Sequence, residues 1–144
     1  MSTFPVLRQT VLDAVDARGL AEFYRRLLGW RYRPGDEPPA TGTDDPQARD
    51  WLVLHGPDGG PRLAVQPVPA LPTVTWPDGP VRPMLHLDLT VPTVADLHAQ
   101  HRRVLALGGS LLSDRSGDEE EPLFVEADPA GHPFCLFVPG DGMP

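Results

Sequence analysis

The residues with the clearest chemical potential are His86 and Asp88, which lie two positions apart in an apolar segment. Side chains two residues apart on a strand project from the same face, so this spacing predicts an imidazole beside a carboxylate. Such a pair can act as a general acid and base in catalysis, and both groups can contact a bound ligand. The alternative is that His86 is a polar group of the strand that hydrogen-bonds Asp88 or another neighbour.

Other candidate nucleophiles are scarce in this chain. The single cysteine, Cys135, lies between Phe134 and Leu136, a setting more typical of a small buried hydrophobe than of a nucleophile. The chain has no lysine, which excludes Schiff-base catalysis and Walker-type phosphate loops. No order of Ser, His and Asp or of Cys and His indicates a hydrolase.

Aromatic side chains suggest a binding pocket. Trp76 lies in a proline-dense segment, and aromatic walls with a few polar groups are typical of small-molecule sites. We expect Trp51, Gln66, Trp76 and Cys135 to contact a ligand. Trp30 follows the first helix directly, so we expect it to pack in the core.

These residues belong to a pattern that occurs twice. Gly56 to Val65 (GPDGGPRLAV) and Asp128 to Phe137 (DPAGHPFCLF) each contain a turn, a proline and an apolar run. The segments upstream also match, because each predicts a strand, a turn, an amphipathic helix and a glycine. A unit of roughly 70–80 residues is therefore repeated.

Both helices have recognisable start and stop signals. Asp16 is a plausible N-cap for the first helix, and Gly29 occupies its C-terminal cap position. Thr93 and Asp96 resemble a capping box at the start of the second helix, which ends at Gly108-Gly109. The apolar stripes predicted to face inward are Leu20, Phe23, Tyr24, Leu27 and Leu28 in the first helix, and Val94, Leu97, His101, Val104 and Leu105 in the second.

The strand signals complete each repeat. We predict strands at 9–14, 30–33, 51–55 and 62–68 in the first half, and at 84–91, 110–112, 123–127 and 133–138 in the second. The fold class is therefore α+β, with two pseudo-symmetric βαβββ units that form a concave sheet around a groove. We expect one domain over residues 1–144, with half-units at about 8–68 and 84–139 and a proline-rich connector at 69–83.

The composition of the chain argues against some classes of binding partner and indicates where in the cell the protein is located. The formal net charge of −8 opposes binding to nucleic acid. There is no apolar stretch long enough to span a bilayer and no signal-peptide pattern, so we expect no membrane partner and a cytoplasmic location. The chain also lacks isoleucine and asparagine, which with the missing lysine indicates a GC-rich bacterial genome.

The chain resembles the vicinal oxygen chelate superfamily, which includes glyoxalase I, extradiol dioxygenases and bleomycin-resistance proteins. The resemblance rests on Leu20 to Trp30 (LAEFYRRLLGW), His86 to Leu89 (HLDL) and Asp128 to Phe134 (DPAGHPF), and it covers about residues 8 to 139. With Thr75 to Pro77 (TWP), the chain is similar to small glyoxalase-like domain proteins of actinobacteria. A possible homodimer is part of what this resemblance implies.

The resemblance also implies where a metal would bind. Family members place ligands on the first and last strands of each half, which here are Gln9, His86, Leu63 and Cys135. Because leucine cannot coordinate a metal, we expect no cofactor; if a divalent metal is present, Gln9 and His86 are its ligands. A shift by two residues brings in Asp13 and Asp88 on the same strand faces, which keeps a rearranged site of Gln9, Asp13, His86 and Asp88 open.

We therefore expect a glyoxalase-like protein that binds a hydrophobic, aromatic or cationic small molecule, as antibiotic-resistance members do. His86, Asp88, Gln9 and Asp13 would form the polar floor of its site. The alternative is a divergent lyase, isomerase or dioxygenase that depends on a metal or uses His86 and Asp88 as an acid–base pair.

Overall fold

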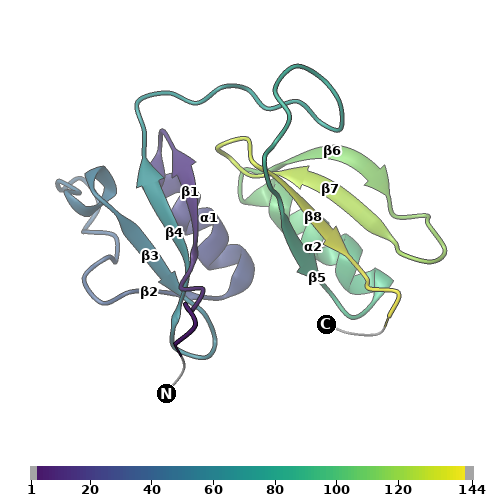
Figure 1. Cartoon of the computed structure of the whole chain (residues 1–144), viewed down its shortest axis with the longest axis horizontal. Helices are drawn as coiled ribbons and strands as arrows, with labels where there is room; N and C mark the ends of the chain where they lie inside the picture. Colours follow the sequence, from purple (N-terminus) through teal and green to yellow (C-terminus); the bar gives the residue numbers. More distant parts are fainter. Residues whose placement is uncertain (1–2, 142–144) are drawn as a thin grey trace. The chain divides into compact units, whose positions relative to one another are not determined.

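The computed structural model describes residues 3–141, which divide into two compact units with a boundary between Leu71 and Pro72 (Figure 1). Each unit contains a four-stranded mixed sheet with one long helix packed on it. The α+β class and the repeated βαβββ order are therefore confirmed. Within the described part of the chain, no helix combines the length and the apolar character needed to cross a membrane.

The first unit begins with β1 and α1 and continues with three further strands. Its elements are β1 (Thr10–Ala14), α1 (Ala17–Leu28), β2 (Arg31–Tyr32), the short 3-10 helix η1 (Gln47–Arg49), β3 (Leu52–His55) and β4 (Pro61–Pro67). The strand order is β1-β4-β3-β2, in which β1 runs parallel to β4 and the other pairs are antiparallel.

The predicted caps delimit α1. The Asp16 side chain accepts a hydrogen bond from the Gly19 amide at 2.9 Å, which satisfies one free N–H at the helix start. Gly29 ends the helix in the left-handed conformation with φ of 69°, which glycine adopts without steric cost. One face of the helix is buried along Ala17, Leu20, Ala21, Phe23, Tyr24 and Leu27, whereas Leu28 at the edge of the predicted stripe is half-buried.

The second unit repeats this order. Its elements are β5 (Leu87–Thr90), α2 (Val94–Ala106), β6 (Ser110–Arg115), β7 (Leu123–Ala127) and β8 (Pro133–Phe137). The strand order is β5-β8-β7-β6, and again the first and last strands of the unit are parallel. β5 is shorter than predicted because its expected first residues, Met84 and Leu85, are exposed and unpaired with any strand.

α2 begins at the predicted capping box but buries less of its surface than expected. The Thr93 hydroxyl accepts from the Asp96 amide at 3.1 Å and donates to the Asp96 carboxylate at 2.7 Å. Only Leu97 and Val104 are buried. The expectation that Val94 and Leu105 face inward is wrong, since each is 45% exposed: Val94 is the first helical residue, and Leu105 lies about 100° around the helix from Val104.

A bulge breaks the exact repetition of the two hairpins. His55 pairs with Pro61, but the next residue, Leu54, pairs with Leu63, so Arg62 is an extra residue in β4. In the second unit, Ala127 pairs with Pro133 and Glu126 pairs with Phe134 without such a gap. The residue that corresponds to Cys135 is therefore Ala64, and the count from the turn glycine that selected Leu63 is wrong by one position.

Candidate functional site

Trp76 is held by a closed loop at the start of the second unit. The Thr75 amide donates to the Val81 carbonyl at 2.8 Å, and the Val81 amide donates to the Thr75 hydroxyl at 3.2 Å. Gly79 in this loop has φ of 129°, and a Cβ there would come within 2.5 Å of the Thr75 hydroxyl oxygen. The loop therefore requires a glycine, and its closure fixes the backbone that carries the indole.

The Trp76 indole meets His86 just before β5. The two rings lie edge to face, with centroids 5.6 Å apart and an interplanar angle of 80°. His86 also contacts Asp88. Its Nε2 lies 3.2 Å from Asp88 Oδ1, as the two-residue spacing predicts. Both side chains remain open to solvent, with 39% of His86 and 58% of Asp88 exposed, so a ligand can reach them.

Cys135 joins this group because β5 and β8 are parallel. Asp88 is the register partner of Cys135, and paired residues project from the same face of a sheet. Burial raises the pKa of the Cys135 thiol to about 11, with additional contributions from the Asp88 charge and a hydrogen bond to its carboxylate. The Cys135 side chain is therefore a protonated thiol at neutral pH. This agrees with the small buried hydrophobe expected from its neighbours in the sequence.

These three side chains are also a possible set of metal ligands. One ligand atom from each of His86, Asp88 and Cys135 lies within 4.8 Å of the other two. Nitrogen, oxygen and sulfur donors in one cluster suit a borderline ion such as Zn²⁺, and binding would displace the thiol proton. A metal held there would act as a Lewis acid toward a carbonyl or similar oxygen of a bound molecule.

The corresponding face of the first sheet carries different side chains. Gln9 precedes the Asp16 cap by the same seven residues that separate His86 from Thr93, but Val11 takes the place of Asp88 and Ala64 that of Cys135. Gln9 Oε1 is buried and has no hydrogen-bond partner in the described part of the chain. Further along the strand, the Gln66 amide lies 3.4 Å from Asp13 Oδ1, which brings these two predicted residues together.

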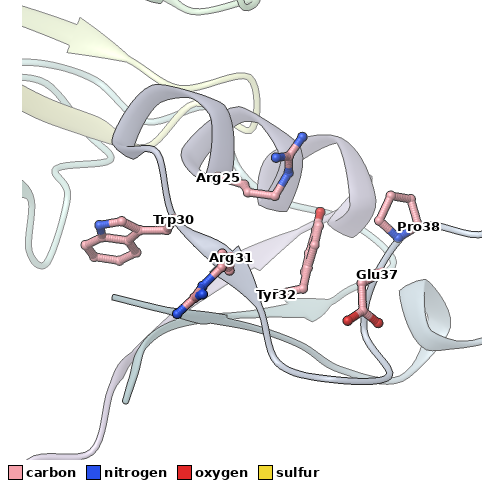
Figure 2. A pocket seen from close by; sticks show the side chains of 6 residues that line it. All are labelled: Arg25, Trp30, Arg31, Tyr32, Glu37 and Pro38. Carbon is pink, nitrogen blue, oxygen red and sulfur yellow. The ribbon is translucent and has the colours of Figure 1, made fainter. Parts of the chain in front are cut away.

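The other two tryptophans both lie in the first unit. Trp51 is half-buried and precedes β3, where its amide donates to the Gln47 carbonyl at 3.0 Å. Trp30 is not a core residue, contrary to expectation. It is half-buried and lines a surface hollow with Arg25, Arg31, Tyr32, Glu37 and Pro38 (Figure 2). Trp30 follows the αL cap at Gly29 and so lies outside the helix whose apolar stripe is buried.

Sequence reasoning missed a second titratable pair in the second unit. Glu126 is fully buried in β7, and its Oε1 lies 2.5 Å from His101 Nδ1 on α2. The His101 ring stacks on Phe124 with centroids 4.1 Å apart, so this histidine is packed, as its place on the helix stripe indicates. Burial raises the pKa of Glu126, and the contact with His101 opposes this shift. One sequence feature could have indicated this pair. Glu126 lies two residues after Phe124 in the same strand, so its carboxylate projects from the same face of the sheet as the Phe124 ring.

Solved structures with similar folds were found across nearly the whole chain. FosX, a fosfomycin resistance protein from Listeria monocytogenes, has a structure with Mn(II) and 1S,2S-dihydroxypropylphosphonic acid. It is 14% identical over 95% of this chain and 94% of its own, with a TM-score of 0.66. A glyoxalase/bleomycin resistance protein/dioxygenase family enzyme from Burkholderia phytofirmans is 11% identical over 91% and 96%, with a TM-score of 0.65.

A hypothetical protein from S. aureus is also similar, at 14% identity over 95% of this chain and 99% of its own, with a TM-score of 0.63. At these identities the likeness establishes the fold alone. No protein with a curated function matches the sequence. The sequence model of one family matches residues 9–137, which include both units. The chain therefore belongs to the family described as "Glyoxalase-like domain".

Proposed function

We propose that this chain binds a small aromatic or cationic molecule at the group formed by Trp76, His86, Asp88 and Cys135. The observation that carries the proposal is the Trp76 indole against His86, 5.6 Å between ring centroids, beside the exposed Asp88 carboxylate. An indole offers a π surface for a ring or a cation, and a carboxylate neutralises positive charge. The buried Cys135 and Val125 supply an apolar floor on the same face.

The charge of this face favours cations over anions. Asp88 is 58% exposed, and the chain as a whole carries a net charge of −8. Such a surface attracts cations and repels phosphonates and phosphates at long range. Among the antibiotics that name the similar proteins, we therefore expect the cationic, ring-containing bleomycin to bind and the anionic fosfomycin not to bind.

The direct test is calorimetric titration of the protein with bleomycin and with fosfomycin. We expect saturable bleomycin binding that Asp88→Asn weakens about threefold, because an ion pair at an exposed carboxylate contributes about 0.7 kcal/mol. Glu119→Gln is the matched control, since it removes the same charge from an exposed loop residue of the same unit. Equal losses in the two variants, or tighter binding of fosfomycin, would contradict the proposal.

A second candidate function is catalysis, which the 3.2 Å contact between His86 Nε2 and Asp88 Oδ1 favours. A carboxylate can orient the imidazole so that it accepts or donates a proton. In that case His86→Ala abolishes turnover of a 2-oxoaldehyde–thiol adduct or a catechol and leaves the circular dichroism spectrum unchanged. Unchanged turnover in that variant would refute the assignment.

Metal content separates the binding protein from a metal-dependent form of the enzyme, whereas the His86→Ala turnover assay tests an enzyme that uses the acid–base pair alone. We expect untagged protein, expressed with Mn, Fe, Co, Ni and Zn available, to lack stoichiometric metal after desalting if it is a metal-free binding protein. Retention of one ion per chain that is lost in His86→Ala would instead support a metal-dependent enzyme, with His86, Asp88 and Cys135 as the first ligands to replace.

A further inference from the structure

The first unit contains a hollow that is independent of the group around His86. It lies beside β2, the edge strand of the first sheet, and has a volume of about 350 Å³. This volume falls at the lower end of the range for small-molecule sites, which is roughly 300–1,000 Å³. Figure 2 shows that Arg25 reaches it from α1, whereas Trp30, Arg31 and Tyr32 reach it from the segment at β2.

Most of the polar groups around this hollow are already paired. Glu22 Oε2 accepts from Arg25 Nε at 2.6 Å and from the Tyr32 hydroxyl at 2.9 Å, and Arg26 approaches its other oxygen at 3.4 Å. The Arg25 guanidinium holds the pKa of Glu22 below its usual value, so this acid is ionised and shared. Glu37 accepts a hydrogen bond from the Gly35 amide.

Arg31 differs from these residues. It is exposed, and no acidic side chain pairs with it within the described residues. In Figure 2 its guanidinium points away from Glu37 and lies on the same side as the Trp30 indole. The local charge is therefore positive, with Arg25, Arg26 and Arg31 against Glu22 and Glu37, although the chain carries −8 overall.

The backbone at Trp30, which precedes Arg31, is fixed by the end of α1. The Trp30 amide donates to the Arg25 carbonyl at 3.0 Å immediately after the αL cap at Gly29. Tyr32 lines the hollow as well. The guanidinium carbons of Arg18 and Arg25 lie over its ring, 5.0 and 6.0 Å from the ring centroid. A half-buried indole next to an unpaired guanidinium is a site that a planar anion can fill.

We propose that this hollow, formed by Trp30, Arg31 and Tyr32, binds a small aromatic carboxylate. The ligand's carboxylate pairs with Arg31, whose planar guanidinium matches it in a bidentate geometry. Its ring packs against the Trp30 indole. Aromatic cations are excluded by the same guanidinium, so this site and the one around Asp88 select opposite charges.

The test uses 4-fluorobenzoate as the probe, followed by ¹⁹F NMR and calorimetry on the full chain. We expect saturable binding that Arg31→Gln weakens at least tenfold, with neutral 4-fluorobenzamide and cationic 4-fluorobenzylamine binding at least tenfold more weakly than the benzoate. Arg102→Gln is the matched control, because it removes the same charge from an exposed residue on α2. Trp30→Leu should also weaken binding.

The proposal is overturned if no saturable binding occurs below 10 millimolar probe, if the benzamide binds as tightly as the benzoate, or if Arg31→Gln and Arg102→Gln behave alike. Asp88→Asn should leave benzoate binding unchanged. That variant therefore separates a failure here from a failure of the site in the second unit.

Discussion

The first unit anchors its helix with six buried residues, whereas α2 in the second unit anchors on Leu97 and Val104 alone. The two helices have nearly the same length, and each begins with a side-chain N-cap, Asp16 in α1 and Thr93 in α2. The difference therefore lies in packing, because burial of apolar surface rather than helix propensity provides most of the stability of a helix in a protein. We infer that the same topology supports one well-anchored half and one that is easier to open.

The buried acids of the two units show a parallel difference. Asp36 in the first unit accepts hydrogen bonds from the Val53 backbone amide at 2.9 Å and from the Gln47 side-chain amide at 3.1 Å. Both of its carboxylate oxygens are therefore satisfied. Glu126 in the second unit pairs through Oε1 with His101, but its Oε2 has no hydrogen-bond partner among residues 3–141. A half-satisfied buried carboxylate costs stability, whereas a satisfied one organises its neighbours.

The largest expected effect is on α2. Leu97→Ala removes one of only two buried anchors and should cost about 3 kcal/mol of unfolding free energy. We expect amide hydrogen exchange over 94–106 to lose its protection while exchange in the first unit is unchanged.

Leu20→Ala in α1 is the matched comparison, because it deletes the same groups at an equally buried position. Its helix keeps five other buried residues and should remain protected. Retained protection of α2 in Leu97→Ala would show that the two units are equally well anchored.

Asp36→Ala should have the next largest effect. It leaves the buried Val53 amide without an acceptor and releases Arg33, which lies 3.0 Å from the carboxylate, so we expect a loss of about 2 kcal/mol in urea unfolding. Asp36→Asn retains a carbonyl oxygen and should lose less. Equal losses in the two variants would show that the charge, and not the hydrogen bond to Val53, is what stabilises this segment.

The third prediction concerns the pH dependence of stability. Because burial raises the pKa of Glu126 in the folded state, its stabilising contribution is complete below about pH 4.5 and is lost as the pH rises through the raised value. Glu126→Gln cannot ionise, so its unfolding free energy should fall less than that of the unmodified protein between pH 4.5 and 8.

His101 contacts this carboxylate and can itself carry a charge, so the unmodified and variant proteins must be compared over the same pH range. Identical pH profiles would mean that Glu126 keeps the same charge in the folded and unfolded chains.

The smallest effect concerns thiol chemistry and not stability. With a pKa of about 11, Cys135 should react slowly with iodoacetamide at pH 8, and the rate should rise steeply toward pH 11. Asp88→Asn removes a negative charge and should raise the rate at pH 8 about threefold. A rate that matches free cysteine at pH 8 would contradict the burial of this thiol.

Local signals in the sequence predicted the caps and the repeated order of elements. Asp16, Gly29 and Thr93 act through neighbours only a few residues away, so spacing is enough to identify them. The His86–Asp88 contact is local in the same sense.

Features that depend on pairing between distant segments could not be predicted in this way. The extra residue at Arg62 changes the register of β4 against β3, and no count along the chain reveals it. The exposure of Leu105 and Val94 depends on how α2 is rotated on its sheet. The Glu126–His101 pair joins residues 25 positions apart, which requires the fold to be known.

The extra residue in β4 determines which positions of the first unit are equivalent to functional positions of the second, and so where substitutions must be made to copy one site into the other unit. Residues must be matched from the helix caps, because matching from the hairpin turns selects the wrong face of the strand. By that rule, Val11 and Ala64 are the positions in the first sheet that stand where Asp88 and Cys135 stand in the second. Val11→Asp combined with Ala64→Cys would copy the acid–thiol pair, whereas a cysteine placed at Leu63 would point into the helix-packed core.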